Sequence, residues 1–231
     1  MSVAQAVLVQ MREIVALGGP VIAVLMLLSV VVVAAALFKL WDFAVLGVGR
    51  HGRIDPALRV LAQDHPAQAR ALLARSRHHL APVFAAALAA PPGDAAALKA
   101  RITAEAEIRL ARMESGFRLL DAIGQIAPLL GLFGTVLGMI DAFRALQEAG
   151  TTVDPAVLAG GIWVALLTTA AGLAVAMPAV LILSWFETRA ARERLWADRV
   201  LATIFCPMDP DADADRPAQA GAASPRMAHG H

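Results

Sequence analysis

The sequence predicts an all-α integral membrane protein with three transmembrane helices and long helices that extend into the cytoplasm. Of its 231 residues, 58% are hydrophobic and 17% are charged, whereas soluble domains have about 45–50% apolar and about 25% charged residues. The apolar excess lies in three stretches that contain no Asp, Glu, Lys or Arg. A chain of this length cannot bury three such helices on all sides. The low aromatic content (5%) and the absence of tyrosine favour helices over strands.

The three uncharged stretches are residues 21–38, 122–140 and 155–186. A helix rises about 1.5 Å per residue and needs about 20 residues to cross a hydrocarbon core of about 30 Å. The first two stretches therefore fit one crossing each, and the third can cross and run on beyond the bilayer. Lys39 and Trp41 follow the first stretch as a pair typical of a membrane interface. Because this stretch begins only at residue 21, we expect a retained helix rather than a cleaved signal peptide.

The distribution of basic residues predicts the orientation. Twelve Lys or Arg residues lie in 39–121 and six in the tail from Glu187, whereas the short segment 147–154 has none. The positive-inside rule places the basic segments in the cytoplasm and the N-terminus outside. The predicted segments are, in order, an outer N-terminal segment (1–20), a first crossing (21–41), a cytoplasmic helical domain (42–121), a second crossing (122–146), an outer loop (147–155), a third crossing (156–186), a cytoplasmic helix (187–206) and a disordered tail (207–231).

Within the cytoplasmic segments, Asp94 is a candidate N-cap for a charged helix over 95–120, which we expect to continue without a break into the second crossing. The histidines do not have zinc-site spacing, and the lone Cys206 cannot form an internal disulfide. We find no phosphate-binding loop, metalloprotease motif or catalytic triad. We therefore predict no enzymatic activity, no metal and no cofactor. A net charge of +1 also gives no global field that would attract nucleic acid.

Two of the crossings carry a ridge of small residues at helical spacing. On the second, the ridge comprises Ala127, Gly131, Gly134, Thr135, Gly138 and Ala142, and on the third it comprises Gly161, Ala165, Thr168, Gly172, Ala176 and Ala179. Small-xxx-small ridges let helix backbones approach closely in lipid. We expect both helices to pack tightly against neighbours, either in the same chain or in other copies. The first crossing, in which only Ser29 is polar, is expected to face lipid.

Three hydroxyl groups lie at mid-membrane positions, on Thr135, Thr168 and Thr169. Each can bond back to a carbonyl of its own helix, or together they can line a polar path. Pro128 and Pro178 interrupt backbone hydrogen bonding in the second and third crossings and leave carbonyls that need another partner. Asp141 lies one turn beyond Gly138. It is either an ordinary interfacial carboxylate or an acid at the outer mouth of a pore.

Three motifs resemble the MotA/TolQ/ExbB proton channel family. Residues 126–140, IAPLLGLFGTVLGMI, closely resemble its second-crossing motif, and residues 166–180, LLTTAAGLAVAMPAV, resemble the third-crossing motif of its ExbB branch. The break Gly18-Gly19-Pro20, followed by a crossing that ends at Lys39-Leu40-Trp41, is similar to the start of that branch. The spacing of the crossings, the outer N-terminus and the large first cytoplasmic segment agree with this resemblance.

The resemblance implies a multi-pass protein of the bacterial inner membrane, with a periplasmic N-terminus and a cytoplasmic C-terminus. It implies a homo-oligomer, in ExbB a pentamer, whose second and third helices line a central pore. The pore would surround the single membrane helices of a partner resembling ExbD or TolR. Proton flow through the assembly would drive an envelope-spanning protein resembling TonB or TolA. Thr135 and Thr169 match the polar pore threonines of the family.

One departure from the family pattern leaves two functions open. ExbB and TolQ proteins usually carry a glutamate at the position of Val164, and no acid lies between Asp154 and Glu187 in this chain. A carboxylate inside a membrane is costly and usually functional. The MotA branch, however, also lacks this glutamate and uses an aspartate of its partner. The chain is therefore expected to be either a proton channel subunit or a pentameric scaffold that does not itself conduct protons.

Overall fold

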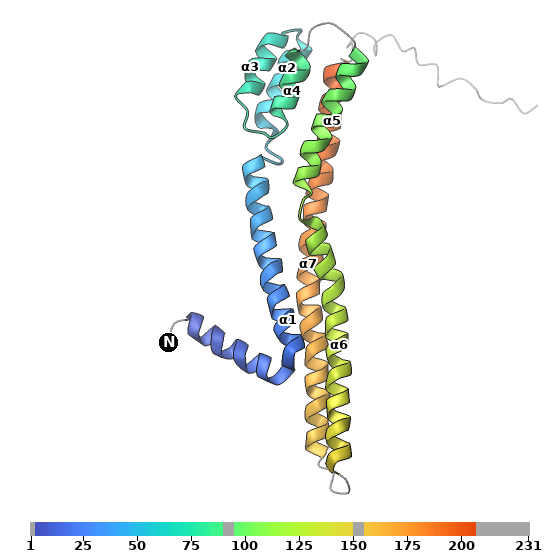
Figure 1. The fold of residues 1–231 in the computed structure, drawn as a ribbon. Coiled ribbons are helices and arrows are strands. Elements are labelled where there is room, and N and C mark those ends of the chain that lie inside the picture. Colours follow the sequence, from blue (N-terminus) through green and yellow to red (C-terminus); the bar gives the residue numbers. More distant parts are fainter. Residues whose placement is uncertain (1–2, 90–94, 150–154, 207–231) are drawn as a thin grey trace, which may run out of the picture. The chain divides into compact units, whose positions relative to one another are not determined.

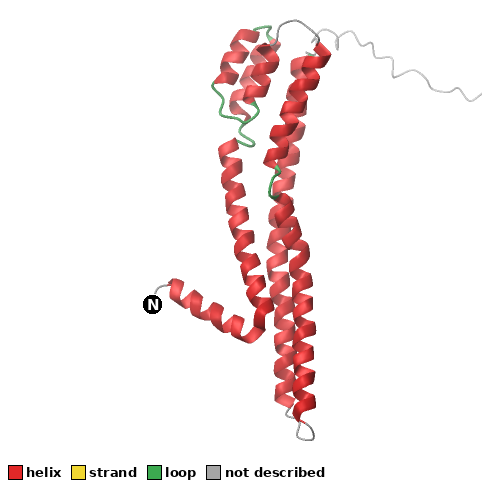
Figure 2. Ribbon diagram, viewed as in Figure 1, coloured by secondary structure: helices red, strands yellow, loops and turns green. Residues whose placement is uncertain are grey.

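The computed structural model describes residues 3–89, 95–149 and 155–206 and contains only helices and turns in these ranges (Figures 1 and 2). The helices are α1 (Val3–Leu46), the 3-10 turn η1 (His51–Arg53), α2 (Ile54–Ala62), α3 (Pro66–Ala74), α4 (Ala81–Ala89), α5 (Ala95–Met113), α6 (Phe117–Ala149) and α7 (Pro155–Phe205). Three helical stretches are long and apolar enough to cross a membrane: Gly19–Leu46, Ala95–Glu148 and Pro155–Phe205. These findings confirm the all-α fold class with three candidate crossings. The predicted cap Asp94 and the predicted disordered tail lie outside the described residues.

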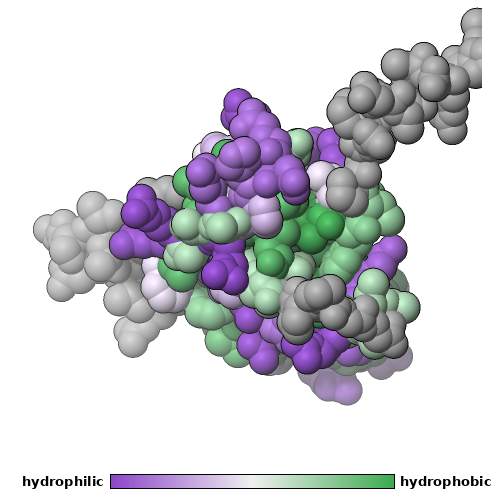
Figure 3. Space-filling view, turned by 90° about the horizontal axis from the view of Figure 1, so that it is seen from above, coloured by the Kyte–Doolittle hydropathy of each residue, from purple (hydrophilic) through white to green (hydrophobic). Residues whose placement is uncertain are grey.

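The chain divides into two compact units. One comprises residues 1–49 and 107–194, which hold α1, α6 and most of α7. The other comprises residues 50–106 and 195–231, which hold α2, α3, α4, most of α5 and the end of α7. In this second unit, Trp196 stacks on the His51 ring with centroids 3.8 Å apart and meets Phe84 edge-on at 5.7 Å. In the end-on view of Figure 3, hydrophilic side chains lie around a patch of hydrophobic ones.

In the first unit, α1 changes direction at Gly19, whose φ of 64° and ψ of −163° are not helical. Glycine adopts a positive φ without the Cβ clash of other residues, and Pro20 then suits the first turn of the renewed helix. The break predicted at this point therefore marks the start of the first crossing. One side of this crossing is buried at Val21 and Leu25, which pack with Ala127 of α6 and Ala176 of α7. The expectation that this crossing faces lipid is therefore wrong for the face of α1 that carries Val21 and Leu25.

A second difference from expectation lies between α5 and α6. The sequence analysis expected one unbroken helix, but α5 ends at Met113 and α6 begins at Phe117, with Gly116 at a φ of 89° between them. The prediction of a continuous helix was wrong. It rested on the alternating charges along the segment, and these do not show that the backbone of Gly116 adopts a left-handed conformation. Arg194 of α7 stabilises the turn between α5 and α6. Its guanidinium donates to the carboxylates of Glu107 at 2.9 Å and Glu114 at 3.2 Å.

Lys39 also differs from expectation. The sequence analysis assigned it to the lipid interface, but the structure buries it, with only 4% of its surface exposed. Its Nζ atom lies 2.8 Å from Oδ2 of Asp42 and about 5.6–5.7 Å from the ring centroids of Phe43 and Phe117. Both rings also contact Phe186 of α7. Lys39 therefore packs inside the first unit, where its partners offset the cost of burying a charge. Trp41, 65% exposed, remains suited to an interface.

A clamp, formed by Arg189 and Glu193 of α7, stabilises the turn that follows α1 through hydrogen bonds. Its glycines Gly47 and Gly49 have φ values of 71° and 76°. The buried carboxylate of Glu193 accepts a hydrogen bond from the Gly49 N–H at 3.0 Å, and the Arg189 guanidinium donates to the Val48 carbonyl at 3.4 Å. Arg189 and Glu193 are four residues apart and so lie on one side of α7. They tie the end of the first crossing to the third.

Candidate functional site

The candidate site is the crossing of α6 and α7, where the two ridges of small residues meet. A Cβ atom added to Gly134 would lie 2.6 Å from Oγ1 of Thr168, and one added to Gly131 would lie 2.9 Å from the Thr168 carbonyl oxygen. One added to Gly172 would lie 2.6 Å from the carbonyl oxygen of Ala127, and one added to Gly138 would lie 3.1 Å from Cβ of Ala165. These positions leave no space for a larger residue. The structure thus places the ridges against each other within one chain, one of the two arrangements that the sequence left open.

Thr168 lies inside this crossing, with 2% of its surface exposed. Its hydroxyl donates to the Ala165 carbonyl at 2.7 Å and is also within 3.2 Å of the Gly131 carbonyl on α6. The hydroxyl therefore bonds back to its own helix, one of the two alternatives above, and also reaches across to the neighbouring helix. A side chain enclosed between two helices has no face toward a pore. Its position is that of a packing contact.

Thr135 and Thr169 are both half-buried at the edge of the crossing. Thr135 donates to the Leu132 carbonyl at 2.6 Å, and Thr169 lies 3.4 Å from the Gly131 carbonyl. A hydroxyl that donates one hydrogen bond can still accept from water through its lone pairs. The geometry of both residues therefore permits contact with ordered water beside the helix pair.

Both threonines lie on the side of the helix pair that faces away from α1. Leu137 of α6 and Ala171 of α7 pack against the cluster that contains Val21 and Leu25 of α1. Thr135 is two residues from Leu137, and Thr169 is two residues from Ala171. At about 100° per residue, each threonine lies about 160° around its helix from the residue of that helix named here. The two hydroxyl groups therefore belong to one side of the α6–α7 pair.

Val164, at the position of the family glutamate, is half-buried on α7. It precedes Thr169 by five residues and is therefore about 140° away around the helix. Val164 and Thr169 therefore lie on different sides of α7. The stretch of α7 from Pro155 to Phe186 contains no acidic or basic residue, so the third crossing itself supplies no titratable group.

The acids on α6 lie near its ends, and one forms a contact that the sequence analysis missed. Asp121 accepts a hydrogen bond from the amide of Gln125 at 2.8 Å, and both side chains are exposed. At about 100° per residue, Asp121 and Gln125 lie about 40° and about 80° around α6 from Thr135. The three residues thus form a polar stripe. The i,i+4 spacing of Asp121 and Gln125 was the available signal. Asp141 is exposed at the other end of the span.

Comparisons with known proteins identify the family of this chain. The model of the MotA/TolQ/ExbB proton channel family matches residues 75–198, more than half of the chain. Biopolymer transport protein exbB1 of Vibrio cholerae is 47% identical over 93 residues, which are 40% of this chain and 38% of that protein. A biopolymer transport protein ExbB-like 1 of Synechocystis is 35% identical over 170 residues, covering 71% of this chain and 66% of the relative.

The Tol-Pal system protein TolQ of Pseudomonas aeruginosa is 39% identical over 100 residues, or 42% of this chain and 40% of that protein. The chain therefore spans between about two fifths and two thirds of the length of these relatives. The matched region includes the α6–α7 crossing and its threonines. The chain belongs to the MotA/TolQ/ExbB proton channel family, with relatives in its ExbB branch.

Proposed function

We propose that this chain is an ExbB/TolQ-like subunit of an inner-membrane proton channel complex. The complex uses proton-motive force to energise an envelope-spanning partner in biopolymer or TonB-dependent transport. Family membership and the transport names of the relatives support this function. The chain has no enzymatic role in this proposal. Its N-terminus is periplasmic and its C-terminus cytoplasmic, with the segment boundaries predicted above.

The proposed assembly is a homopentamer around a single-pass membrane protein resembling ExbD or TolR, with a TonB-like or TolA-like energy transducer as the protein that it drives. The observation that supports a central path is the placement of Thr135 and Thr169 on one side of the α6–α7 pair, away from α1. With Val164 in place of an acid, a carboxylate of the partner must carry the proton at mid-membrane. The two threonine hydroxyls order water beside that carboxylate.

The second candidate function is a pentameric membrane scaffold that does not itself conduct protons. The observation that favours it is the lack of any titratable side chain from Pro155 to Phe186. In this alternative, the Thr135 hydroxyl serves only the Leu132 carbonyl of its own helix, and the Thr169 hydroxyl serves only the Gly131 carbonyl of the neighbouring helix.

Proton flux into liposomes that contain the chain and its partner separates the two functions. The test variant combines Thr135→Val and Thr169→Val, which keep the side-chain shape and remove the hydroxyls. Thr203→Val is the matched control, because Thr203 is exposed and bonds only to the Arg199 carbonyl of its own helix. We expect the double variant to lose most of the flux and the control to retain it. Unchanged flux and an unchanged cellular phenotype in the double variant would favour the scaffold.

A substitution at Val164 tests whether a carboxylate on the third crossing can take part in proton transfer. We expect Val164→Glu to preserve or raise proton-driven activity, because it restores a titratable group to the third crossing. Val164→Gln is the matched control, since it has a similar shape and cannot release a proton. Flux that is lost with glutamate and retained with glutamine would contradict the expectation that a carboxylate at this position supports proton transfer.

A further inference from the structure

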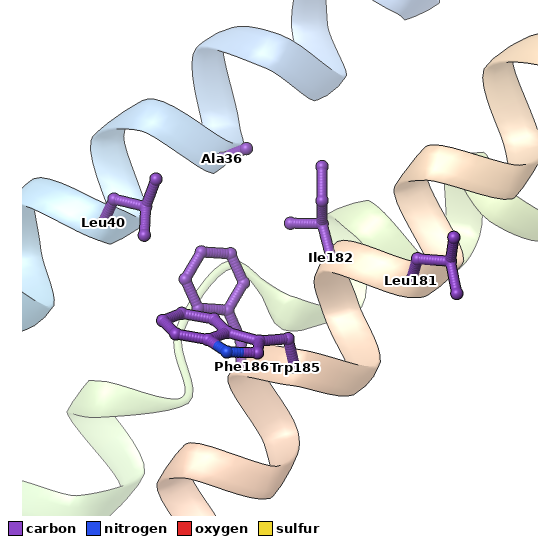
Figure 4. A pocket seen from close by; sticks show the side chains of 6 residues that line it. All are labelled: Ala36, Leu40, Leu181, Ile182, Trp185 and Phe186. Atoms are coloured by element: carbon purple, nitrogen blue, oxygen red, sulfur yellow. The ribbon is translucent and has the colours of Figure 1, made fainter.

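A groove between α1 and α7 is not used by the proposed proton path. It has a volume of about 300 Å³ and is lined by Ala36, Leu40, Leu181, Ile182, Trp185 and Phe186 (Figure 4). All six lining side chains are apolar. The four α7 residues that line the groove lie between about 100° and about 160° around the helix from Thr169. A ligand in the groove would therefore not block the threonines.

The groove lies at the end of the apolar part of both helices. Leu40 is followed on α1 by Asp42, and Phe186 is followed on α7 by Glu187. Trp185, 55% exposed, lies at this end of the groove. Its indole combines an apolar ring with a polar N–H, the chemistry that favours the boundary between hydrocarbon and headgroups. The groove thus lies in hydrocarbon and ends near the headgroup layer.

Beyond Trp185, the same edge of α7 becomes polar and then positively charged. Thr188, Arg189 and Arg192 follow Trp185 at intervals of three, four and seven residues, so they lie on its side of the helix. Arg192 is exposed, and Arg189 is half-buried with one nitrogen on the Val48 carbonyl. A guanidinium has five donors, so Arg189 retains others for a second acceptor. The acid Glu187 lies about 160° around the helix from Arg189. Glu193 lies on the same side as Arg189, but its carboxylate is buried and accepts a hydrogen bond from the Gly49 N–H.

We propose that this groove binds one glycerophospholipid molecule, with an acyl chain between α1 and α7 and its phosphate at Arg189 and Arg192. The order of apolar side chains, indole and guanidinium groups along α7 matches the order of acyl chain, glycerol backbone and phosphate in such a lipid. Arginine is suited to phosphate because its planar donors bind two oxygens at once. A helix of a second copy would fill the apolar part but would supply no phosphate to the two guanidinium groups.

The experiment measures quenching of tryptophan fluorescence by phosphatidylglycerol with brominated acyl chains. The chain has four tryptophans, and single-tryptophan variants retain either Trp185 or Trp163, with phenylalanine at the other positions. Trp163 is the matched control, because it is 65% exposed on the same helix and does not line the groove. The oligomer is purified in detergent and titrated with lipid at low molar ratios. We expect quenching of Trp185 to saturate near one lipid per chain and Trp163 to respond only weakly.

Two substitutions in the Trp185 variant locate the lipid. Ala36→Phe fills the groove and should abolish saturable quenching, whereas Ala34→Phe, on the exposed side of α1, should retain it. Arg192→Gln should raise the half-saturating lipid concentration about fivefold, and Arg192→Lys should largely restore it. Arg192 is exposed, so this result does not depend on repacking of the fold.

The proposal is overturned if Trp185 and Trp163 are quenched alike or if Ala36→Phe and Ala34→Phe behave alike. An unchanged half-saturating concentration in Arg192→Gln would also overturn the phosphate position. Quenching that appears only after the oligomer has dissociated would mean that a second copy occupies the groove, contrary to the proposal. These outcomes are independent of proton flux, so they do not depend on the proposed channel function.

Discussion

Thr168 and Thr169 are neighbours in the chain, yet they occupy different surroundings. Thr168 is enclosed between α6 and α7, with its hydroxyl near the Gly131 carbonyl of the opposite helix. Thr169 is half-buried on the outer side of the pair. The sequence identified all three hydroxyls as candidates for a polar path but could not separate them. A ridge pattern shows that a helix face is packed and does not show against which residues.

The two threonines should therefore respond differently to the same substitution. Thr168→Val removes an enclosed hydroxyl that donates to the Ala165 carbonyl and lies 3.2 Å from the Gly131 carbonyl of α6, and it should lower the free energy of unfolding by about 1 kcal/mol. Thr169→Val should change stability by less than about 0.5 kcal/mol but lower proton flux. Thermal unfolding in detergent and flux in liposomes measure the two effects. Equal loss of stability in both variants would contradict this division of roles.

For Lys39, the position in the sequence predicted the wrong environment. A lysine at the end of an apolar stretch is typical of the lipid interface, but here the side chain is turned inward to Asp42, Phe43 and Phe117. The residues that surround it come from α6 and α7 as well as α1. A pattern within one segment cannot predict an environment built from three.

Removal of one partner of Lys39 should cost more than removal of both charges. We expect Asp42→Asn to lower the free energy of unfolding by about 2 kcal/mol, below the usual range for a fully buried pair because Asp42 is 29% exposed. The double variant Lys39→Met with Asp42→Asn should recover most of this loss, since no buried charge remains. The measurement is thermal unfolding of both variants in one detergent. A double variant less stable than Asp42→Asn would show that the ion pair itself is the larger stabilising contribution.

At the scale of helices, sequence periodicity correctly indicated the apolar lengths and the small-residue ridges. It did not reveal the turn around Gly116, because the residues on both sides of this glycine have the pattern of a helix. It also did not predict the clamp between α7 and the turn after α1, because Glu193 and Gly49 are 144 residues apart. Contacts between distant segments depend on how the helices pair. That pairing follows from the close approach of α6 and α7.

The glycines of this close approach should be sensitive to a single methyl group. In Gly134→Ala, the added Cβ would lie 2.6 Å from Thr168 Oγ1, so the helices must separate at a cost of about 2 kcal/mol. Gly160→Ala is the matched control, because it has no atom within 4 Å of the new Cβ and should be neutral or slightly stabilising. Gly134→Leu and Gly172→Leu should disrupt the fold of the chain as well as its assembly. Helicity and thermal unfolding measure the effect, and equal stability of the two alanine variants would contradict the packing.

At the scale of the whole molecule, the distribution of basic residues makes a topology prediction that the helices alone do not test. Cys206 is exposed just beyond α7 and is the only cysteine in the chain. The predicted topology places it in the cytoplasm, so a membrane-impermeant thiol reagent should label it only after cell lysis. In the control, Gln147→Cys with Cys206→Ser, the thiol lies at the far end of α6 and should be labelled in intact cells. The reverse labelling pattern would invert the topology.

The oligomer requires a physical basis other than the small-residue ridges, because those ridges already pack against each other within one chain. The half-buried hydroxyls of Thr135 and Thr169 lie at membrane depth on one side of the helix pair. Lipid is a poor neighbour for polar groups, so this side is better covered by other copies and a polar path than by acyl chains.

We therefore expect native mass spectrometry in mild detergent to find five copies, assembled through the side that carries these threonines. Leu132 and Leu173 are exposed on this side, at 58% and 45%, whereas Leu27 is 63% exposed on α1. Leu132→Ala with Leu173→Ala should weaken the pentamer because apolar contact between copies is lost, while Leu27→Ala should leave it intact. Single chains alone would contradict the assembly. A pentamer weakened only by Leu27→Ala would mean that the copies meet through α1 and that the threonine side does not line their centre.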